Sequence, residues 1–147
     1  MTLGKESRTT YILTNNPQVV KVWASRVRVD FIEAGLVDFY KAARDRIHEG
    51  EVLLSHPLSS SIKPGETPYK SLLIKQADNS PQLDFDSLDL IEAALAATEK
   101  FLQYYGQRLP YYSERVHRDF QLIDLSVINS ALESAGLDSF ALETRGG

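Results

Sequence analysis

Two hydrophobic patterns alternate along this chain, and their order limits its fold more than any other feature. Short runs rich in β-branched and aliphatic residues, which are typical of strands, lie at 10–14, 27–31, 51–55 and 71–75. Segments with apolar residues at every third or fourth position, which are typical of amphipathic helices, lie at 36–49, 86–105 and beyond 113. This order predicts an α/β fold with a small mixed sheet of about four strands, helices packed on it and a helical C-terminal half.

Local signals in the first half refine this prediction. Asn16 followed by Pro17 forms a favourable N-cap and first-turn pair, so a short helix is expected there. Gly50 follows the 36–49 segment, where a left-handed C-cap is expected. The uninterrupted apolar runs at 52–54 and 72–74 predict central strands, because such strands are covered on both faces.

The second half carries its own helix signals. Asp86, with an acidic residue three positions later, resembles a capping box and predicts the start of a long helix. Ser113 and Asp124 each stand at a possible N-cap, so two further helices are expected, from Ser113 through Phe120 and from Asp124 to Gly136.

Length and composition set the class of protein. The chain has 147 residues, so we expect one domain across 1–147, with flexible ends at 1–8 and 138–147. The formal net charge of −4 argues against binding nucleic acid by bulk charge. The chain has no cysteine, and its three histidines show no metal-ligand spacing, so neither a metal nor a cofactor is expected. Neither a membrane-spanning run nor a signal-peptide core is evident, which predicts a cytoplasmic protein.

The connection at 56–69 is unusual for its length, stiffness and density of polar groups. Three prolines restrict its backbone, and loops of this length in compact domains are often functional. It offers an imidazole, a lysine and several hydroxyls, which suit a small anionic or polar ligand. The candidate ligand-binding residues here are His56, Ser61, Lys63, Thr67 and Tyr69. The alternative of an ordinary Pro- and Ser-rich surface loop stays open.

A second polar cluster follows the first expected strand. Asn15 and Asn16 are added to the candidate ligand-binding residues, because helix starts present free N–H groups to anions. If the strands at 10–14 and 51–55 run in the same direction, Asn15 and His56 both lie at carboxyl ends, where open α/β sheets bind ligands. A simple turn and helix cap is the alternative for the two asparagines.

Two other functions are compatible with these residues. The first is an enzyme in which His56 acts as general acid or base, with Glu66 as the only carboxylate in the loop. No P-loop, dinucleotide-binding or serine-hydrolase motif is present, so no reaction is assigned. The second is a module that docks on a protein partner or a second copy through the tyrosine-rich region 104–112, which core packing explains equally well. His117 is expected on a solvated helix face.

Several segments resemble the GrdX family. The most specific of them form one block: LLSHPL at 53–58, SIKP at 61–64 and ETPYKS at 66–71. Others are TNNP at 14–17, ARD at 43–45, HEG at 48–50 and DFQLID at 119–124. Glu51 departs from the pattern, because a histidine is expected at that position.

The GrdX resemblance covers most of residues 11–135. It implies a small accessory protein associated with glycine reductase operons in amino-acid-fermenting anaerobes, with a regulatory or substrate-handling role. The family brings no established activity, and a chain without cysteine or selenocysteine cannot be the redox component.

Residues 14–17 are also similar to the start of the inosine triphosphate pyrophosphatases, in which a Thr-x-Asn-x-x-Lys turn meets phosphates. Val19 stands at the lysine position, and no matching acidic metal motif is evident. This second resemblance covers only a handful of residues, so a nucleotide pyrophosphatase remains a minor variant of the enzyme alternative.

Overall fold

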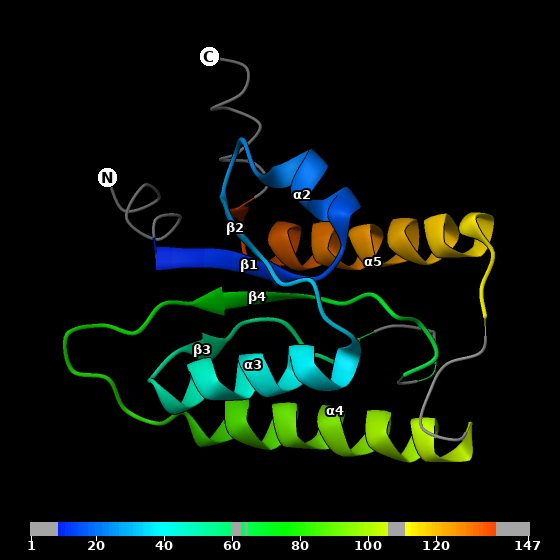
Figure 1. Ribbon diagram of the computed structural model, residues 1–147. Helices are drawn as coiled ribbons and strands as arrows, with labels where there is room; N and C mark the ends of the chain where they lie inside the picture. Colours follow the sequence, from blue (N-terminus) through cyan, green and yellow to red (C-terminus); the bar gives the residue numbers. More distant parts are fainter. Residues whose placement is uncertain (1–8, 60–62, 64, 106–110, 138–147) are drawn as a thin grey trace.

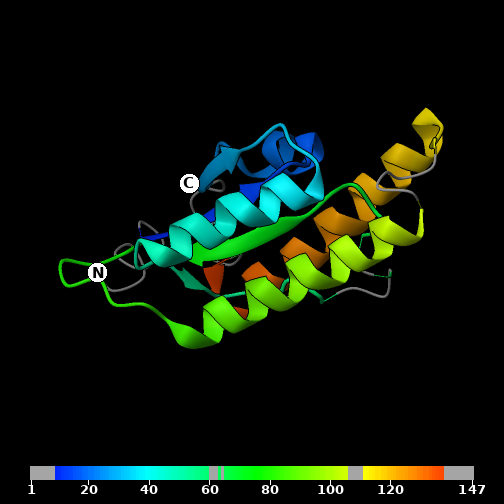
Figure 2. The same cartoon turned by 60° about the horizontal axis from the view of Figure 1, so that its bottom comes forward.

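A mixed four-stranded sheet forms the middle layer of the protein, with two helices on each face (Figures 1 and 2). The structure is a computed structural model that describes residues 9–59, 63, 65–105 and 111–137. The α/β class, the single mixed sheet and the helical C-terminal half predicted from the sequence are confirmed. The expected flexible ends at 1–8 and 138–147 lie outside the described residues.

The strand order in the sheet is β2-β1-β4-β3. The strands are β1 (Thr10–Thr14), β2 (Arg28–Phe31), β3 (Val52–Leu53) and β4 (Ser71–Lys75). β1 pairs with β2 in parallel and with β4 antiparallel, and β4 pairs antiparallel with β3. β1 and β3 therefore run in the same direction, as the predicted meeting of their carboxyl ends requires.

One prediction about the strands is wrong. β4 is central, but β3 lies at an edge and comprises only two residues, although its apolar run predicted a central strand. The strand is covered by packing rather than by a second neighbour, because Leu53 joins the core beneath α3 and α4. An apolar run reports burial of the side chains and does not specify how many strands lie beside it.

Helices α2 (Pro17–Trp23) and α3 (Leu36–His48) follow β1 and β2, and their end signals behave as predicted. Asn16 is the N-cap of α2, and its side chain accepts a hydrogen bond from the backbone N–H of Gln18. Gly50 has a φ of 101°, the left-handed conformation expected just after a helix.

The two long helices differ from the predictions at their ends. α4 (Phe85–Tyr104) begins two positions earlier than the Asp86 signal implied, because Asp84 is the N-cap and accepts a hydrogen bond from the backbone N–H of Ser87. α5 (Glu114–Ser134) is one helix, so the expected break at Asp124 is wrong.

The reason for the continuous α5 lies in its buried stripe. Asp124, Ile128 and Leu132 are four residues apart, so they share one face and all are buried. Asp124 hydrogen bonds to Ser71 of β4 and to Asn16, the N-cap of α2, rather than to the amides of its own helix. Because its carboxylate is occupied by these tertiary hydrogen bonds, Asp124 does not act as an N-cap, and the helix continues through this position.

Each face of the sheet has its own hydrophobic core. Side chains of one strand face, including Tyr11 and Leu72, pack against α3 and α4. Side chains of the other face, including Ile12 and Leu73, pack against α2 and α5. Both central strands are therefore covered on two sides, which explains their uninterrupted apolar sequences. None of the described helices is long and apolar enough to span a membrane.

Candidate functional site

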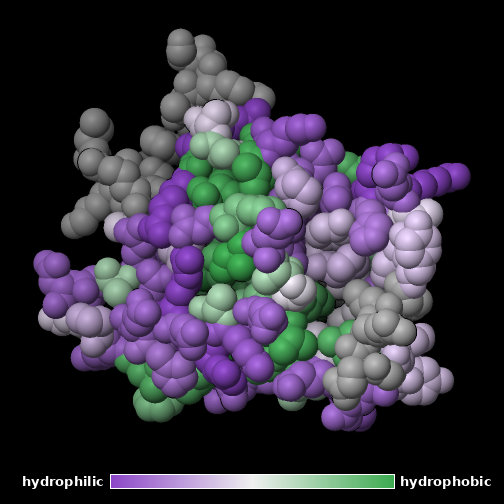
Figure 3. Space-filling model, in the orientation of Figure 1, coloured by the Kyte–Doolittle hydropathy of each residue, from purple (hydrophilic) through white to green (hydrophobic). Residues whose placement is uncertain are grey.

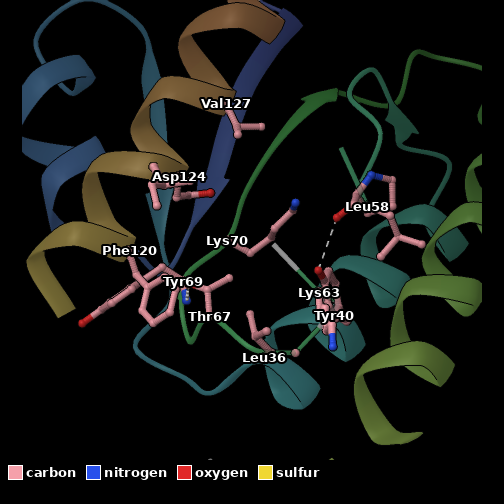
Figure 4. A pocket seen from close by; sticks show the side chains of 13 residues that line it. Leu36, Tyr40, Leu58, Lys63, Thr67, Tyr69, Lys70, Phe120, Asp124 and Val127 are labelled. Atoms are coloured by element: carbon pink, nitrogen blue, oxygen red, sulfur yellow. Dashed lines mark hydrogen bonds between the residues drawn. The ribbon is translucent and has the colours of Figure 1, made fainter. Parts of the chain in front are cut away.

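A small cavity lies at the end of the sheet where β1 finishes and β4 begins (Figure 4). It has a volume of about 30 Å³, which is room for about two water molecules. Its walls come from α3, the 57–70 segment and α5. The lining residues are Leu36, Tyr40, Pro57, Leu58, Lys63, Gly65, Thr67, Tyr69, Lys70, Phe120, Ile123, Asp124 and Val127. Lys63 and Ile123 are exposed and mark the mouth of the cavity.

Lys70 is the most unusual residue of this cavity. It is only 6% exposed, although its side chain ends in an ammonium group. Figure 4 shows this side chain extending into the space between α5 and the turn at Leu58. Among the described residues, the Lys70 ammonium has neither a hydrogen-bond nor an ion-pair partner. Burial lowers the pKa of Lys70, and the nearby charge of Asp124 opposes that decrease.

The backbone of Lys70 is held firmly by the end of β1. Its N–H donates to Asn15 Oδ1 at 2.8 Å, and its carbonyl accepts from the Asn15 N–H at 3.2 Å. The Thr14 hydroxyl also lies 3.4 Å from the Lys70 carbonyl. These contacts fix the direction in which the lysine side chain leaves the strand.

Asp124 is the buried carboxylate of the site, and its oxygens are occupied. Oδ1 accepts from the backbone N–H of Ser71 at 3.0 Å. Oδ2 accepts from the Ser71 hydroxyl at 2.7 Å and from Asn16 Nδ2 at 3.0 Å. Burial raises the pKa of this carboxyl, while the hydrogen bonds from Ser71 and Asn16 oppose the rise. Asp124 therefore joins α5 to the sheet, and it gives Lys70 a nearby negative charge without a direct contact.

Aromatic side chains connect the loop to the start of α5. The Tyr69 hydroxyl lies 2.9 Å from His117 Nδ1, and the two rings meet edge to face. Tyr112 packs edge-on against His117 and donates a hydrogen bond from its hydroxyl to the Glu66 carbonyl at 2.8 Å. The prediction of a solvated His117 is wrong, because this histidine is half-buried among tyrosines.

The predicted site residues fall into four groups. Lys63, Thr67 and Tyr69 line the cavity. Asn15 and Asn16 frame it instead, and neither lines the cavity itself. His56 is exposed at the start of the loop, where its Nδ1 accepts the backbone N–H of Leu58 at 3.1 Å. Ser61 lies outside the described residues.

The two framing asparagines use their side-chain amides within the protein. Asn15 Nδ2 donates to the carbonyls of Ala34 and Pro68, both at 2.9 Å. Asn16 Nδ2 donates to the Gln121 carbonyl at 2.8 Å and to Asp124, while Asn16 Oδ1 caps α2. Direct contact of either asparagine with a ligand stays a prediction. The contacts do establish that the two predicted clusters meet, because Asn15 hydrogen bonds to Pro68 in the loop and to Lys70 just after it.

Sequence reasoning did not assign Lys70 and Asp124 to the site, although each carried a signal. Lys70 immediately precedes β4, and its neighbour Ser71 is also buried. Asp124 lies four residues before Ile128 on the buried stripe of α5. A charge that falls on an apolar stripe is a candidate for a buried functional group, because an isolated buried charge is costly.

The tyrosine-rich region 104–112 is only partly a surface. Tyr104 and Tyr111 are 84% and 93% exposed, whereas Tyr112 is half-buried through its contacts with the loop. Residues 106–110 lie outside the described residues. Nothing among the described contacts identifies a partner for this region.

The chemistry available at the cavity is that of a cation among hydroxyls. Among the described residues, no three acidic or histidine side chains gather as metal ligands would. The cavity contains the ammonium of one buried lysine, and hydroxyl-bearing side chains lie on its walls. Such a set of donors can hold a small anion by charge-assisted hydrogen bonds.

Comparison with known proteins gives one result. No curated protein and no solved structure matches the chain. A protein-family model described as "GrdX-like protein" matches residues 11–133, a range that contains the whole lining of the cavity. On this match across most of its length, the chain belongs to the GrdX-like protein family.

Proposed function

We propose that this GrdX-like protein binds a small anion, a carboxylate or an inorganic oxyanion, in the cavity at the end of its sheet. The observation that carries the proposal is Lys70, a residue only 6% exposed, whose ammonium reaches into the cavity and has no hydrogen-bond partner among the described residues. The anion would accept hydrogen bonds from that ammonium. Thr67 on the wall and Lys63 at the mouth would supply further donors.

The energetic argument is that a buried charge needs a partner. Removing an ammonium from water costs several kcal/mol unless another group compensates it. Asp124 supplies part of that compensation through space, but its oxygens already accept from Ser71 and Asn16. An anion in the cavity would contact Lys70 directly and so remove most of the remaining cost.

The size of the cavity limits the ligand. A volume of about 30 Å³ admits a group of a few heavy atoms, such as a carboxylate or a small oxyanion. Pockets for drug-sized ligands are about ten times larger. Any larger part of the ligand would leave the cavity past the exposed side chains of Lys63 and Ile123.

The cellular role belongs to the same proposal. We place the protein in the cytoplasm as an accessory protein of glycine reductase and amino-acid fermentation. Its membership of the GrdX-like family supports this placement. A small anionic metabolite of that metabolism would fit the charge and the size of the cavity.

The test is thermal unfolding in the presence of acetate, glycine, inorganic phosphate and selenite. At ten times its dissociation constant, a bound ligand raises the free energy of unfolding by about 1.4 kcal/mol, which is roughly 3–6 °C in melting temperature for a domain of this size. Lys70→Met should abolish the shift, because Met fills similar space without the charge.

Lys75→Met is the matched control, since Lys75 is exposed at the far end of the same strand. It should respond to the anion as the wild type does. Equal shifts in the Lys70→Met and Lys75→Met variants would place binding elsewhere. The absence of a shift with every anion in the wild type would overturn the proposal.

A further inference from the structure

The outer edge of β2 is open in the described part of the chain, because β2 is the terminal strand of the sheet. Figures 1 and 2 agree that this strand lies at the side of the sheet away from β3. Figure 3 shows a band of hydrophobic residues on the face that this strand presents. Phe31 at the end of the strand is 46% exposed, and Val27 and Val29 are half-buried.

The backbone of this edge has hydrogen-bonding groups that point outward. The N–H of Ile32 donates to the Thr14 carbonyl at 2.8 Å, in the parallel ladder with β1. In a strand, the backbone N–H and C=O groups of alternate residues point toward the same neighbouring strand. Those of Asp30 therefore point toward β1, as those of Ile32 do. Those of Val29 and Phe31 point away from β1, toward the open edge. An unpaired row of this kind is a template for another strand.

The side chains along this edge are complementary to those of a second copy of the same strand running antiparallel. Residues 27–31 read Val-Arg-Val-Asp-Phe, with a valine at the centre and opposite charges on its two sides. We propose that two copies of the protein form a symmetric dimer in which their β2 strands pair antiparallel, with Val29 opposite Val29. This arrangement places Arg28 opposite Asp30 of the second copy, and Val27 opposite Phe31.

The two faces of the strand remain separate in this dimer. Arg28 and Asp30 lie on the side of α3, because Arg28 stacks on the Tyr11 ring at 4.1 Å and Asp30 pairs with Arg46 at 2.7 Å. Val27 and Val29 lie on the other side, against the core of α2 and α5. Directly opposite residues in an antiparallel pair share a face, so charges meet charges and apolar side chains meet apolar side chains.

The charges favour the register centred on Val29 over the registers centred on Arg28 or Asp30. A two-fold axis at Arg28 places the two Arg28 side chains opposite each other, and an axis at Asp30 does the same for the two aspartates. Like charges directly opposite destabilise a strand pair. Only the axis at Val29 gives two opposite-charge pairs, and each Asp30 then lies between Arg28 of its own chain, at 2.6 Å, and Arg28 of the other.

The backbone geometry agrees with the same register. Val29 opposite Val29 is a pair that exchanges two hydrogen bonds through its outward N–H and C=O groups. The Arg28 and Asp30 pairs on either side are then of the closer, non-hydrogen-bonded type, with about 4.5 Å between Cα atoms. Oppositely charged side chains interact most readily at that separation.

The first experiment is analytical ultracentrifugation of the full chain at roughly 5 to 500 μM, a range that brackets a weak dimer. The wild type should shift from monomer to dimer with increasing concentration. The Arg28→Asp variant and the Asp30→Arg variant should each dimerise at least tenfold more weakly. An equimolar mixture of the two variants should dimerise again, because every facing pair is then of opposite charge.

A backbone variant separates the strand pairing from the charges. Val29→Pro removes an outward N–H and leaves the ladder with β1 intact, and proline is tolerated at such edge positions. It should stay monomeric, whereas Val29→Thr, which keeps the N–H and the β-branched shape, should still dimerise. Circular dichroism and thermal melting confirm that each variant is folded.

The contrary outcomes are equally specific. A wild type that stays monomeric throughout would overturn the dimer, and the strand edge would then be a candidate for pairing with a different protein. Dimerisation of Val29→Pro at wild-type strength would place the contact on another surface. A mixture of the two charge variants that stays monomeric would refute the register centred on Val29.

Discussion

At the residue scale, the candidate site contains two opposite charges, on Asp124 and Lys70, that differ in their hydrogen bonding. Asp124 is buried but receives three hydrogen bonds from Ser71 and Asn16. Lys70 is buried to the same extent, but its ammonium donates no hydrogen bond to the described residues. A saturated buried group is a structural element, whereas an unsaturated one beside a cavity is a candidate for binding.

Asp124 can be tested as a structural residue by changing one atom. In Asp124→Asn, an NH₂ group replaces an oxygen that now accepts from Ser71 or Asn16, so a donor faces a donor. We expect the free energy of unfolding to fall by about 2–4 kcal/mol, measured by urea denaturation. Asp119→Asn, at an exposed position of the same helix, should stay within about 0.5 kcal/mol of the wild type. Equal stabilities of the two variants would contradict this role.

In the proposed site, Lys70 should make the binding of an anion sensitive to pH. The protonated amine is the form that binds, and burial places its pKa below the usual lysine value. The affinity for acetate should therefore be constant while acetate is ionised and Lys70 is charged, and decline as the pH rises through that lowered pKa. Above it, the dissociation constant increases about tenfold per pH unit.

Isothermal titration across this pH range measures the effect. Lys70→Arg is the control, since arginine stays charged throughout the range. Its affinity should show no such decline. A wild type whose affinity is independent of pH up to the ordinary range of lysine would show that the Lys70 charge is not involved.

At the element scale, Asn16 connects three pieces of structure. Its Oδ1 caps α2, and its Nδ2 reaches both the Gln121 carbonyl and Asp124 on α5. Asn16→Ala should lower the free energy of unfolding by about 2–4 kcal/mol, because it removes the cap and leaves buried acceptors without donors. Asn16→Ser keeps an N-cap oxygen and should lose about 1 kcal/mol less. Urea denaturation distinguishes these values, and equal losses would show that the cap contributes nothing.

Gly50 shows how a turn depends on one residue type. Its φ of 101° suits glycine, and a Cβ there would lie 2.5 Å from Pro81 Cβ. Gly50→Ala should therefore destabilise the protein by about 1–3 kcal/mol. Gly35, at the N-cap of α3, has an ordinary φ of −70° and open space around it. Gly35→Ser should be neutral or stabilising, and a larger loss at Gly35 than at Gly50 in thermal melts would contradict this account.

The sequence predicted most element ends that local chemistry decides, although it placed the start of α4 at Asp86 and the N-cap is Asp84. The N-cap at Asn16 and the left-handed residue at Gly50 are examples, because each depends only on its immediate neighbours. The predictions that are wrong, a helix break at Asp124 and a central position for β3, involve residues whose partners are distant in sequence. Asp124 bonds to Ser71, 53 residues away, and no local signal records such a contact.

At the scale of the whole molecule, the sheet brings two distant segments to one end. The end of β1 and the loop before β4 meet through the bonds between Asn15 and Lys70. The sequence predicted that these segments meet on the condition that β1 and β3 run in the same direction, and the two strands do so. It did not predict that α5 closes the cavity, since that placement depends on the packing of Ile128 and Leu132 against the second face of the sheet.

The measurement that tests the central claim most directly is the NMR signal of the Lys70 side chain, observed in protein with labelled lysine and assigned by its loss in Lys70→Met. The signal should shift in a saturable way when acetate or inorganic phosphate is added, while the signal of the exposed Lys75 stays unchanged. If the Lys70 signal does not respond to any of the small anions, the cavity is not the binding site and the proposed function is wrong.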